Sequence, residues 1–120
     1  MDGCAMPLSP DCQTRVKLTI VNLAKQDRSG FGQGSAALLH GVQETGSLNM
    51  AAKRLGMAYS KAWRLIKDSE EELGFTLLNR DGARGSTLTE DGLSFLERYD
   101  KLCAQVSEYA SKSYAELFAE

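Results

Sequence analysis

The stretch from Ser47 to Gly74, SLNMAAKRLGMAYSKAWRLIKDSEEELG, decides the fold. Its first part has apolar residues at the i, i+3, i+4, i+7 spacing of an amphipathic helix. These residues are Leu48, Ala51, Ala52 and Leu55. Ser47 is a favourable N-cap and Gly56 ends the run, so the sequence predicts a helix of about eight residues. A helix this short has to pack closely against a neighbour, because it is unstable by itself in water.

The second part of the stretch predicts a longer helix from Ala58 to Leu73, ended by Gly74. One face of this helix collects the small and apolar residues. They are Ala58, Ala62, Leu65, Ile66, Ser69 and Leu73. The opposite face carries Ser60, Arg64 and Lys67, with Lys61 and Trp63 on the flanks. A short helix, a turn and a second helix with a polar, basic outer face form the pattern of a helix-turn-helix motif.

Charge is distributed unevenly along the chain, although the net charge is only −2. Residues 45–67 contain five basic and no acidic residues, whereas residues 89–120 contain seven acidic and three basic residues. The acidic residues 70–72 occupy the far end of the longer helix, where they repel phosphate and oppose the helix dipole, so we expect them to lie away from DNA. A cationic patch on an acidic chain indicates a local nucleic-acid surface. The alternative is an ordinary solvated helix face.

Directly after this motif, the sequence predicts a two-stranded hairpin. An apolar segment at residues 75–78 precedes a turn sequence at residues 81–85, and residues 86–88 form the returning strand. Arg84 lies near the tip, where it would reach the DNA backbone or the minor groove. Taken alone, Arg84 is an ordinary solvated hairpin residue. A helix-turn-helix followed by such a hairpin has the layout of a winged helix.

The last part of the chain predicts one long helix that begins after Thr89, a favourable N-cap. Apolar residues recur along it at spacings of three and four. They are Leu96, Tyr99, Cys103, Val106, Ala110 and Leu117. This stripe is too long for a small winged helix to cover, so we expect it to pair with a second copy in a homodimer. The last turns are expected to fray after Tyr114.

The chain before the helix-turn-helix motif divides into three parts. Residues 1–13 contain both prolines and no periodicity, which predicts a flexible tail. Residues 16–20 alternate apolar and polar, which predicts a half-buried strand. Ser35 is expected to cap a helix that runs to Thr45, with Gly46 as its C-terminal stop.

The predicted fold class is mainly α with a small β component. After the tail, residues 14–88 would form a winged helix-turn-helix with a leading strand, and residues 89–120 the long C-terminal dimerisation helix. A chain of 120 residues that is 42% hydrophobic and 25% charged is typical of one soluble domain. No apolar run approaches the roughly 20 residues that span a membrane, and no secretory signal is recognised, so we expect a cytoplasmic protein without a membrane partner.

Patterns of catalytic or metal-binding residues are absent from the sequence. Its three cysteines, Cys4, Cys12 and Cys103, form no CxxC or Cys/His pair, which argues against a metal site. His40 is the only histidine and is expected to be structural. The GFGQG string at residues 30–34 has the composition of a phosphate-binding loop, but no Walker lysine and no second parallel strand follow it. We therefore expect no enzyme and no cofactor; a nucleotide-binding assay tests this alternative.

Five short strings form a more specific pattern. They are GSL at 46–48, AAK at 51–53, LGM at 55–57, YSKAW at 59–63 and LTEDG at 88–92. Together they resemble the N-terminal winged helix-turn-helix DNA-binding domain of ModE-type molybdate-responsive transcription regulators, which is related to the LysR type. The leading strand and the FGQG loop suit the ModE arrangement. The resemblance covers about residues 15–118.

Three departures from the ModE pattern limit what the resemblance implies. Members of that family carry a C-terminal oxyanion-binding region that this chain lacks, so molybdate sensing is not carried over, and any small-molecule effector stays unknown. Many members have a longer, glycine-rich wing than residues 81–86 of this chain. Many also have serine where Ala58 stands, which removes a cap or a phosphate contact.

The leading hypothesis is a homodimeric transcription regulator that binds double-stranded DNA. Tyr59, Ser60 and Arg64 are the candidates for base or near-base contacts, because arginine is the commonest specific reader of guanine. The candidates for phosphate contacts are Lys61, Lys67, Lys53 and Arg84. The alternative is a winged-helix protein-interaction module without DNA binding, which would not bind random duplex DNA at low salt.

Overall fold

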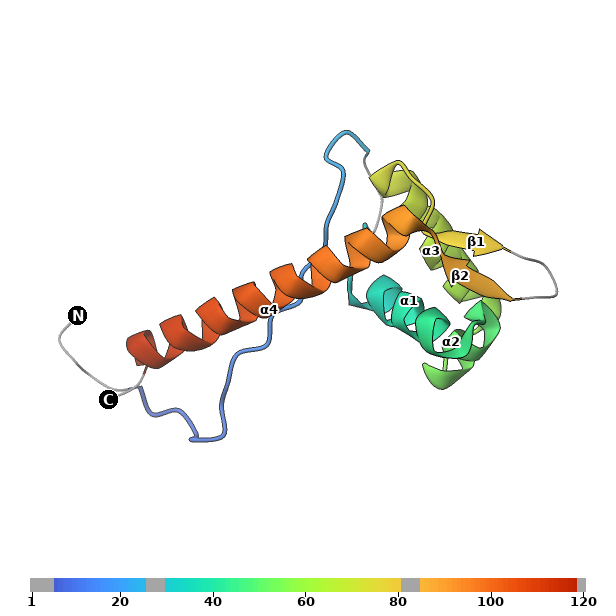
Figure 1. The fold of residues 1–120 in the computed structure, drawn as a ribbon. Helices are drawn as coiled ribbons and strands as arrows, with labels where there is room; N and C mark the ends of the chain where they lie inside the picture. Colours follow the sequence, from blue (N-terminus) through green and yellow to red (C-terminus); the bar gives the residue numbers. More distant parts are fainter. Residues whose placement is uncertain (1–5, 26–29, 81–84, 119–120) are drawn as a thin grey trace.

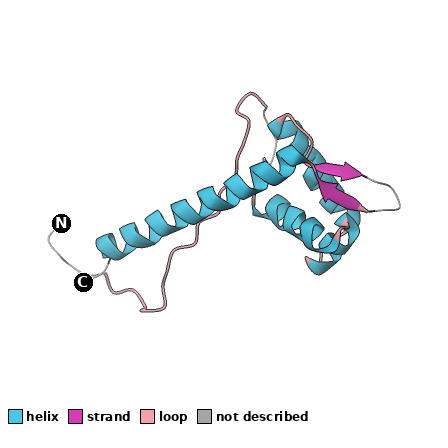
Figure 2. Ribbon diagram, viewed as in Figure 1, coloured by secondary structure: helices cyan, strands magenta, loops and turns pink. Residues whose placement is uncertain are grey.

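Helices dominate the structure, and a single hairpin accompanies them in its described part. The computed structural model describes residues 6–25, 30–80 and 85–118. Its elements are α1 (Gln33–Thr45), α2 (Leu48–Arg54), α3 (Tyr59–Leu73), β1 (Leu78–Arg80), β2 (Ser86–Leu88) and α4 (Glu90–Phe118). In Figure 1, α1, α2, α3 and the hairpin form a body from which α4 extends as one long rod. The two strands are antiparallel and lie at one edge of this body (Figure 2). The predicted fold class, a winged helix-turn-helix with a long C-terminal helix, is confirmed.

Helix α2 is stabilised by close packing against α1. Its N-cap is Ser47, as predicted, whose Oγ accepts a hydrogen bond from the N–H of Met50 at 3.2 Å. A Cβ added to Gly41 of α1 would lie 2.6 Å from the Cβ of Ala51, which is itself buried. Because Gly41 has no side chain, the two backbones approach closely, and a helix of only 7 residues gains the tertiary contacts that it needs.

Phe31 is the centre of the core, although the sequence places it only in a loop. Its side chain is fully buried, and its ring packs in T-shaped geometry against Phe95 and Tyr99, with centroid distances of 4.8 and 4.9 Å. Five further large side chains that are fully buried come from α1, α3, α4 and the segment before β1. They are Leu38, Leu39, Ile66, Leu77 and Leu96. Trp63 packs half-buried against this core.

Tyr99 also attaches the N-terminal segment to α4. Its hydroxyl donates a hydrogen bond to the carbonyl oxygen of Leu18 at 2.6 Å. Burial raises the pKa of Tyr99 to about 12, and the neighbouring Cys103 adds to this shift. The phenol therefore stays protonated at neutral pH and keeps its role as a donor.

Two predictions about the start of the chain were wrong. Ser35 is not an N-cap: α1 begins at Gln33, Gly32 is the capping residue, and the buried Ser35 places its Oγ 2.9 Å from the Oγ of Ser69 on α3. Within the described residues, the leading segment forms no strand, but makes one antiparallel bridge between Ile20 and Phe31. The alternation of residues 16–20 correctly predicted which side chains are half-buried, but a strand also requires a partner strand.

A third prediction, that α4 frays after Tyr114, was also wrong. The helix continues to Phe118, and the ring centroid of Tyr114 lies 5.2 Å from that of Phe118. Thr89 caps this helix as predicted, because its Oγ1 accepts a hydrogen bond from the N–H of Gly92 at 2.8 Å.

Glu72 has a structural role that sequence patterning missed. It is 2% exposed, and its Oε2 accepts a hydrogen bond from the backbone N–H of Asn22 at 2.5 Å. The Asn22 side-chain amide donates in turn to the carbonyl oxygen of Glu72 at 3.1 Å. The other carboxylate oxygen of Glu72, Oε1, has no hydrogen-bond partner among the described residues. The C-terminal end of α3 therefore holds the segment that leads into the core.

Replacing Phe31 with alanine should destabilise the fold by about 3–5 kcal/mol, because it removes a fully buried ring and leaves a cavity. Chemical denaturation followed by circular dichroism measures the change in the free energy of unfolding. Leu23→Ala is the matched control, since Leu23 is 90% exposed and should cost almost nothing. Equal stabilities of the two variants would contradict the central place of Phe31.

Candidate nucleic-acid interface

The outward side of α3 brings five of the predicted site residues onto one helix. Tyr59 is 51% exposed, and the other four side chains are exposed as well. We call these residues the outer face of α3: Tyr59, Ser60, Lys61, Arg64 and Lys67. The opposite side of the helix is buried through Ala62, Ile66 and Ser69. The core side therefore fixes the rotation of α3 and turns its basic residues to solvent.

The N-terminus of α3 strengthens the positive potential of this face. The helix begins after Ala58, which makes no side-chain capping hydrogen bond, and its first turn contains no acidic residue. The first backbone N–H groups of a helix have no partner within the helix and carry the positive end of its dipole. At this end the dipole and the charges of Lys61 and Arg64 have the same sign.

Two further basic residues of the motif differ in their pairing. Lys53 of α2 is exposed, and no ion pair of its side chain is found among the described residues. Arg54 beside it pairs with Glu44 of α1, with 2.9 Å between Nη1 and Oε1.

Lys67 of the outer face contacts an aromatic ring. Its Nζ lies 6.0 Å from the centroid of the Trp63 ring, a cation–π arrangement that favours one orientation of a flexible side chain.

The acidic end of α3 is largely turned inward. Glu72 is buried, and the carboxylate of Glu70 accepts hydrogen bonds from the N–H groups of Leu77 at 2.7 Å and Leu78 at 3.4 Å. Two of the three carboxylates that the sequence places at this end are thus engaged in the fold. Their negative charges are offset by backbone donors.

The hairpin is attached to the helix-turn-helix motif at its base. Its register pairs Leu78 with Leu88, Asn79 with Thr87 and Arg80 with Ser86. The N–H of Ser86 donates to the carbonyl oxygen of Gly46 at 2.9 Å, and a Cβ at Gly85 would clash with the same oxygen. The base of the wing is therefore positioned by the end of α1. The predicted contact residue Arg84 lies outside the described residues.

The apolar stripe of α4 is divided between two environments. Leu96 and Tyr99 are 1% and 3% exposed and belong to the core of their own chain. Cys103, Val106 and Ala110 are half-buried, and Leu117 is 53% exposed. Only the part of the stripe from Cys103 onward is thus available for another molecule.

The other candidate chemistries find little support in the described residues. The GFGQG loop is occupied structurally: Phe31 fills the core, and a Cβ at Gly30 would lie 2.5 Å from the carbonyl oxygen of Ile20. His40 is exposed and pairs with Asp100 of α4, with 2.8 Å between Nε2 and Oδ2. No group of three His, Cys, Asp or Glu residues suited to a metal ion occurs in the ranges that the structure covers. None of the helices described there is both long and apolar enough to cross a membrane.

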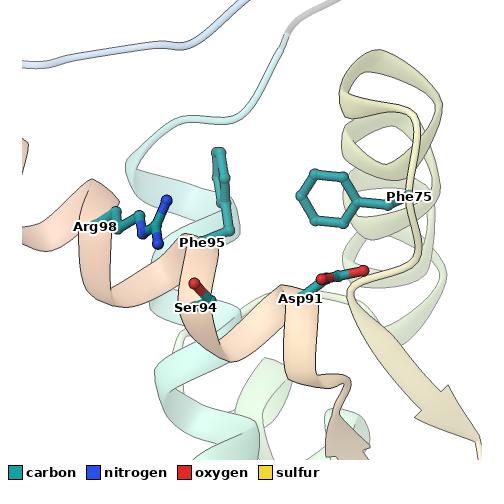
Figure 3. A pocket seen from close by; sticks show the side chains of 5 residues that line it. All are labelled: Phe75, Asp91, Ser94, Phe95 and Arg98. Atoms are coloured by element: carbon teal, nitrogen blue, oxygen red, sulfur yellow. The ribbon is translucent and has the colours of Figure 1, made fainter.

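A cavity of about 290 Å³ lies where the end of α3 meets the first turns of α4 (Figure 3). It is lined by Phe75, Asp91, Ser94, Phe95 and Arg98. The cavity is open to solvent on its outer side, and its two aromatic rings pack at a centroid distance of 5.7 Å.

Comparison with known proteins places the chain in a family. The model of bacterial regulatory helix-turn-helix proteins of the lysR family matches residues 35–93. The HTH-type transcriptional regulator CrgA of Neisseria meningitidis is 39% identical over 66 residues, which are 55% of this chain and 22% of CrgA. The transcriptional regulator ModE of Yersinia pestis is 34% identical over 87 residues, which are 69% of this chain and 33% of ModE. The chain therefore spans about a fifth to a third of the length of these relatives.

Two solved structures of protein–DNA complexes resemble this chain in both fold and sequence. The CbnR_DBD–DNA complex is similar with a TM-score of 0.59 and 30% identity, covering 68% of this chain and 93% of that chain. The BenM_DBD complex with benA site 1 DNA has a TM-score of 0.58 and 30% identity, covering 72% and 96%. The sequence similarity to ModE supports the predicted resemblance. The matching family model is that of the lysR family, to which CbnR also belongs. The chain belongs to the lysR family of bacterial regulatory helix-turn-helix proteins.

Proposed function

We propose that this chain is the DNA-binding part of a sequence-specific transcription regulator that acts as a homodimer in the cytoplasm. The observation that carries the proposal is the outer face of α3, which presents exposed basic residues on a helix whose other side is buried. In a helix-turn-helix protein the second helix enters the major groove with its N-terminal end. Membership of the lysR family supports the proposal, since the relatives named above are transcription regulators.

Each residue of the outer face has a proposed role. Arg64 would donate two hydrogen bonds to a guanine edge, and Tyr59 and Ser60 would make base or near-base contacts. Lysines hold phosphate as point charges, so Lys53, Lys61 and Lys67 would bind the DNA backbone. Arg84 would reach the backbone or the minor groove from the wing.

The proposed dimer uses α4 from Cys103 to Leu117. Apolar residues in this part recur at spacings of three and four, as in helices that pair. Residues 14–88 would form the DNA-binding domain and residues 89–120 the dimerisation helix, with residues 1–13 as a tail. A two-fold pair would present two α3 helices to half-sites separated by about 34 Å, one turn of DNA.

Arg64→Ala should weaken binding to the preferred site by about 1–3 kcal/mol and relax the preference at one base pair, because a bidentate base contact is lost. The site is first obtained by selection from random duplexes, and affinities are then measured by fluorescence anisotropy. Arg98→Ala on the exposed surface of α4 is the matched control. Normal binding by Arg64→Ala would show that α3 is not the recognition helix. A wild-type chain that binds no duplex at low salt would instead favour the protein-interaction module.

Lys67→Ala should weaken binding to all sequences alike, because a phosphate contact carries no base information. The slope of log K against log salt concentration should fall in magnitude by about one. Titrations at several salt concentrations with the selected duplex and a scrambled duplex measure both effects, with Lys112→Ala on α4 as the control. A loss confined to the selected duplex would assign Lys67 to base recognition instead.

Val106→Glu should produce monomers and lower the DNA affinity together, because an unpaired charge would be buried between two α4 helices. Light scattering measures the mass, and Gln105→Glu places the same charge on an exposed neighbouring position as a control. A wild-type mass near the 13.1 kDa of one chain at micromolar concentration would refute the dimer.

A further inference from the structure

Helix α3, the hairpin of β1 and β2, and helix α4 meet at one hydrogen-bonded junction. Glu70 of α3 accepts the N–H groups of Leu77 and Leu78, where β1 begins. The carbonyl oxygen of Leu77 accepts the N–H of Thr89 at 3.0 Å, where β2 ends. Leu77 is fully buried and therefore joins α3 on one side to the start of α4 on the other. We call the group Glu70, Leu77, Thr89 and Gly92 the junction.

The α4 side of the junction is equally close-fitting. The Thr89 hydroxyl donates to the carbonyl oxygen of Thr76 at 2.7 Å and accepts the N–H of Gly92 at 2.8 Å. A Cβ at Gly92 would clash with the carbonyl oxygen of Leu77. The first turn of α4 thus rests directly on the backbone that Glu70 holds.

The other hydrogen bonds and ion pairs described for α4 reach α3 only through further segments of the chain. Tyr99 bonds to Leu18 of the N-terminal segment, and Asp100 pairs with His40 of α1. Helices α3 and α4 share little direct backbone contact. On the outer side, the contact between Phe75 and Phe95 borders the open cavity of Figure 3, while both rings also pack against the core. The hydrogen bonds of Glu70 therefore connect α3 directly to the backbone on which the first turn of α4 rests.

We propose that Glu70 is a positioning residue that sets the direction of α3 relative to α4, and thereby the half-site spacing that the dimer accepts. This proposal rests on the proposed function, because spacing has a meaning only for a dimer bound to DNA. Its carboxylate is suited to the task, since charge-assisted hydrogen bonds are shorter and stronger than neutral ones.

Small changes of direction have large consequences because α4 is long. A tilt of about 5° at its start moves a point 20 residues along the helix by roughly 2.6 Å, at about 1.5 Å per residue. The two-fold axis doubles this displacement between the two α3 helices. The combined displacement of the two α3 helices exceeds one base-pair step of about 3.4 Å.

The test compares wild type with Glu70→Ala on duplexes whose two half-sites are moved apart one base pair at a time, and on a duplex with a single half-site. Misplaced half-sites prevent simultaneous binding, so wild type should prefer its best spacing roughly 10²-fold. Glu70→Ala should keep its single half-site affinity within about twofold but reduce the spacing preference at least fivefold. Glu97→Gln removes an exposed negative charge from the start of α4 and should keep the wild-type preference. An unchanged spacing preference in a folded Glu70→Ala chain would overturn the proposal.

A second measurement needs neither DNA nor the full removal of the side chain. Spin labels at Ser60→Cys and Glu108→Cys, with the native cysteines replaced by alanine and the labelled chain diluted into unlabelled chain, report the distance between α3 and α4. Glu70→Gln, which retains an oxygen acceptor but no charge, should broaden this distance distribution, and Gly92→Ala should shift its centre. Distributions identical to that of the parent would overturn the proposal even if Glu70→Ala does not fold. Absence of DNA binding by wild type, together with a broadened distribution, would refute the proposed function but leave the positioning role intact.

Discussion

The close approach of α1 and α2 at Gly41 and Ala51 is the constraint on which the body of the protein depends. A helix of 7 residues cannot persist by itself, so its existence rests on burial of Ala51 and Ala52 at short range. Its end leads within a few residues into α3, since the N–H of Met57 is bonded to the carbonyl oxygen of Ala52 at 2.9 Å. A shift of α2 would therefore move the N-terminus of α3, the end that carries the proposed base contacts.

Local signals in the sequence predicted the elements, whereas long-range partners were out of reach. The cap at Ser47, the stops at Gly46 and Gly74 and the amphipathic face of α3 each depend on neighbours within one or two turns. Serine is a favourable N-cap by residue type, so Ser35 was predicted as a cap, and only the fold brings Ser69 to it. For Glu72 the sequence predicted only a position away from DNA, and its burial was not foreseen, because acidic residues are rarely buried. No sequence period indicates that Asn22, fifty positions away, supplies its partner.

The surface charge of the chain depends on which charged side chains have partners, as well as on where they lie in the sequence. Arg54 is occupied by Glu44, while Glu70 and Glu72 are occupied by backbone donors. A positive surface remains on the outer face of α3 although the chain is acidic overall. Net charge is therefore a poor guide to the partner of such a domain, because long-range steering and phosphate contact respond to the local field. The sequence correctly predicted the exposure of this face, while the contacts proposed for it are a matter for the DNA experiments.

Helix α4 performs two structural tasks with one apolar stripe. Leu96 and Tyr99 pack into the body of their own chain, and Cys103 packs at the edge of that core. Val106, the next member of the same stripe, is half-buried and lies on the same side of the helix. Because the spacings of three and four continue as far as Ala110, burial of the first two residues fixes the rotation of the helix about its axis for the residues that follow. The surface proposed for the second copy is thereby aimed by the core, before any partner is present. The packing of Phe31 against Tyr99 therefore also sets the orientation of the proposed dimer surface. A core substitution that rotates α4 would disturb the assembly without altering a residue of its interface.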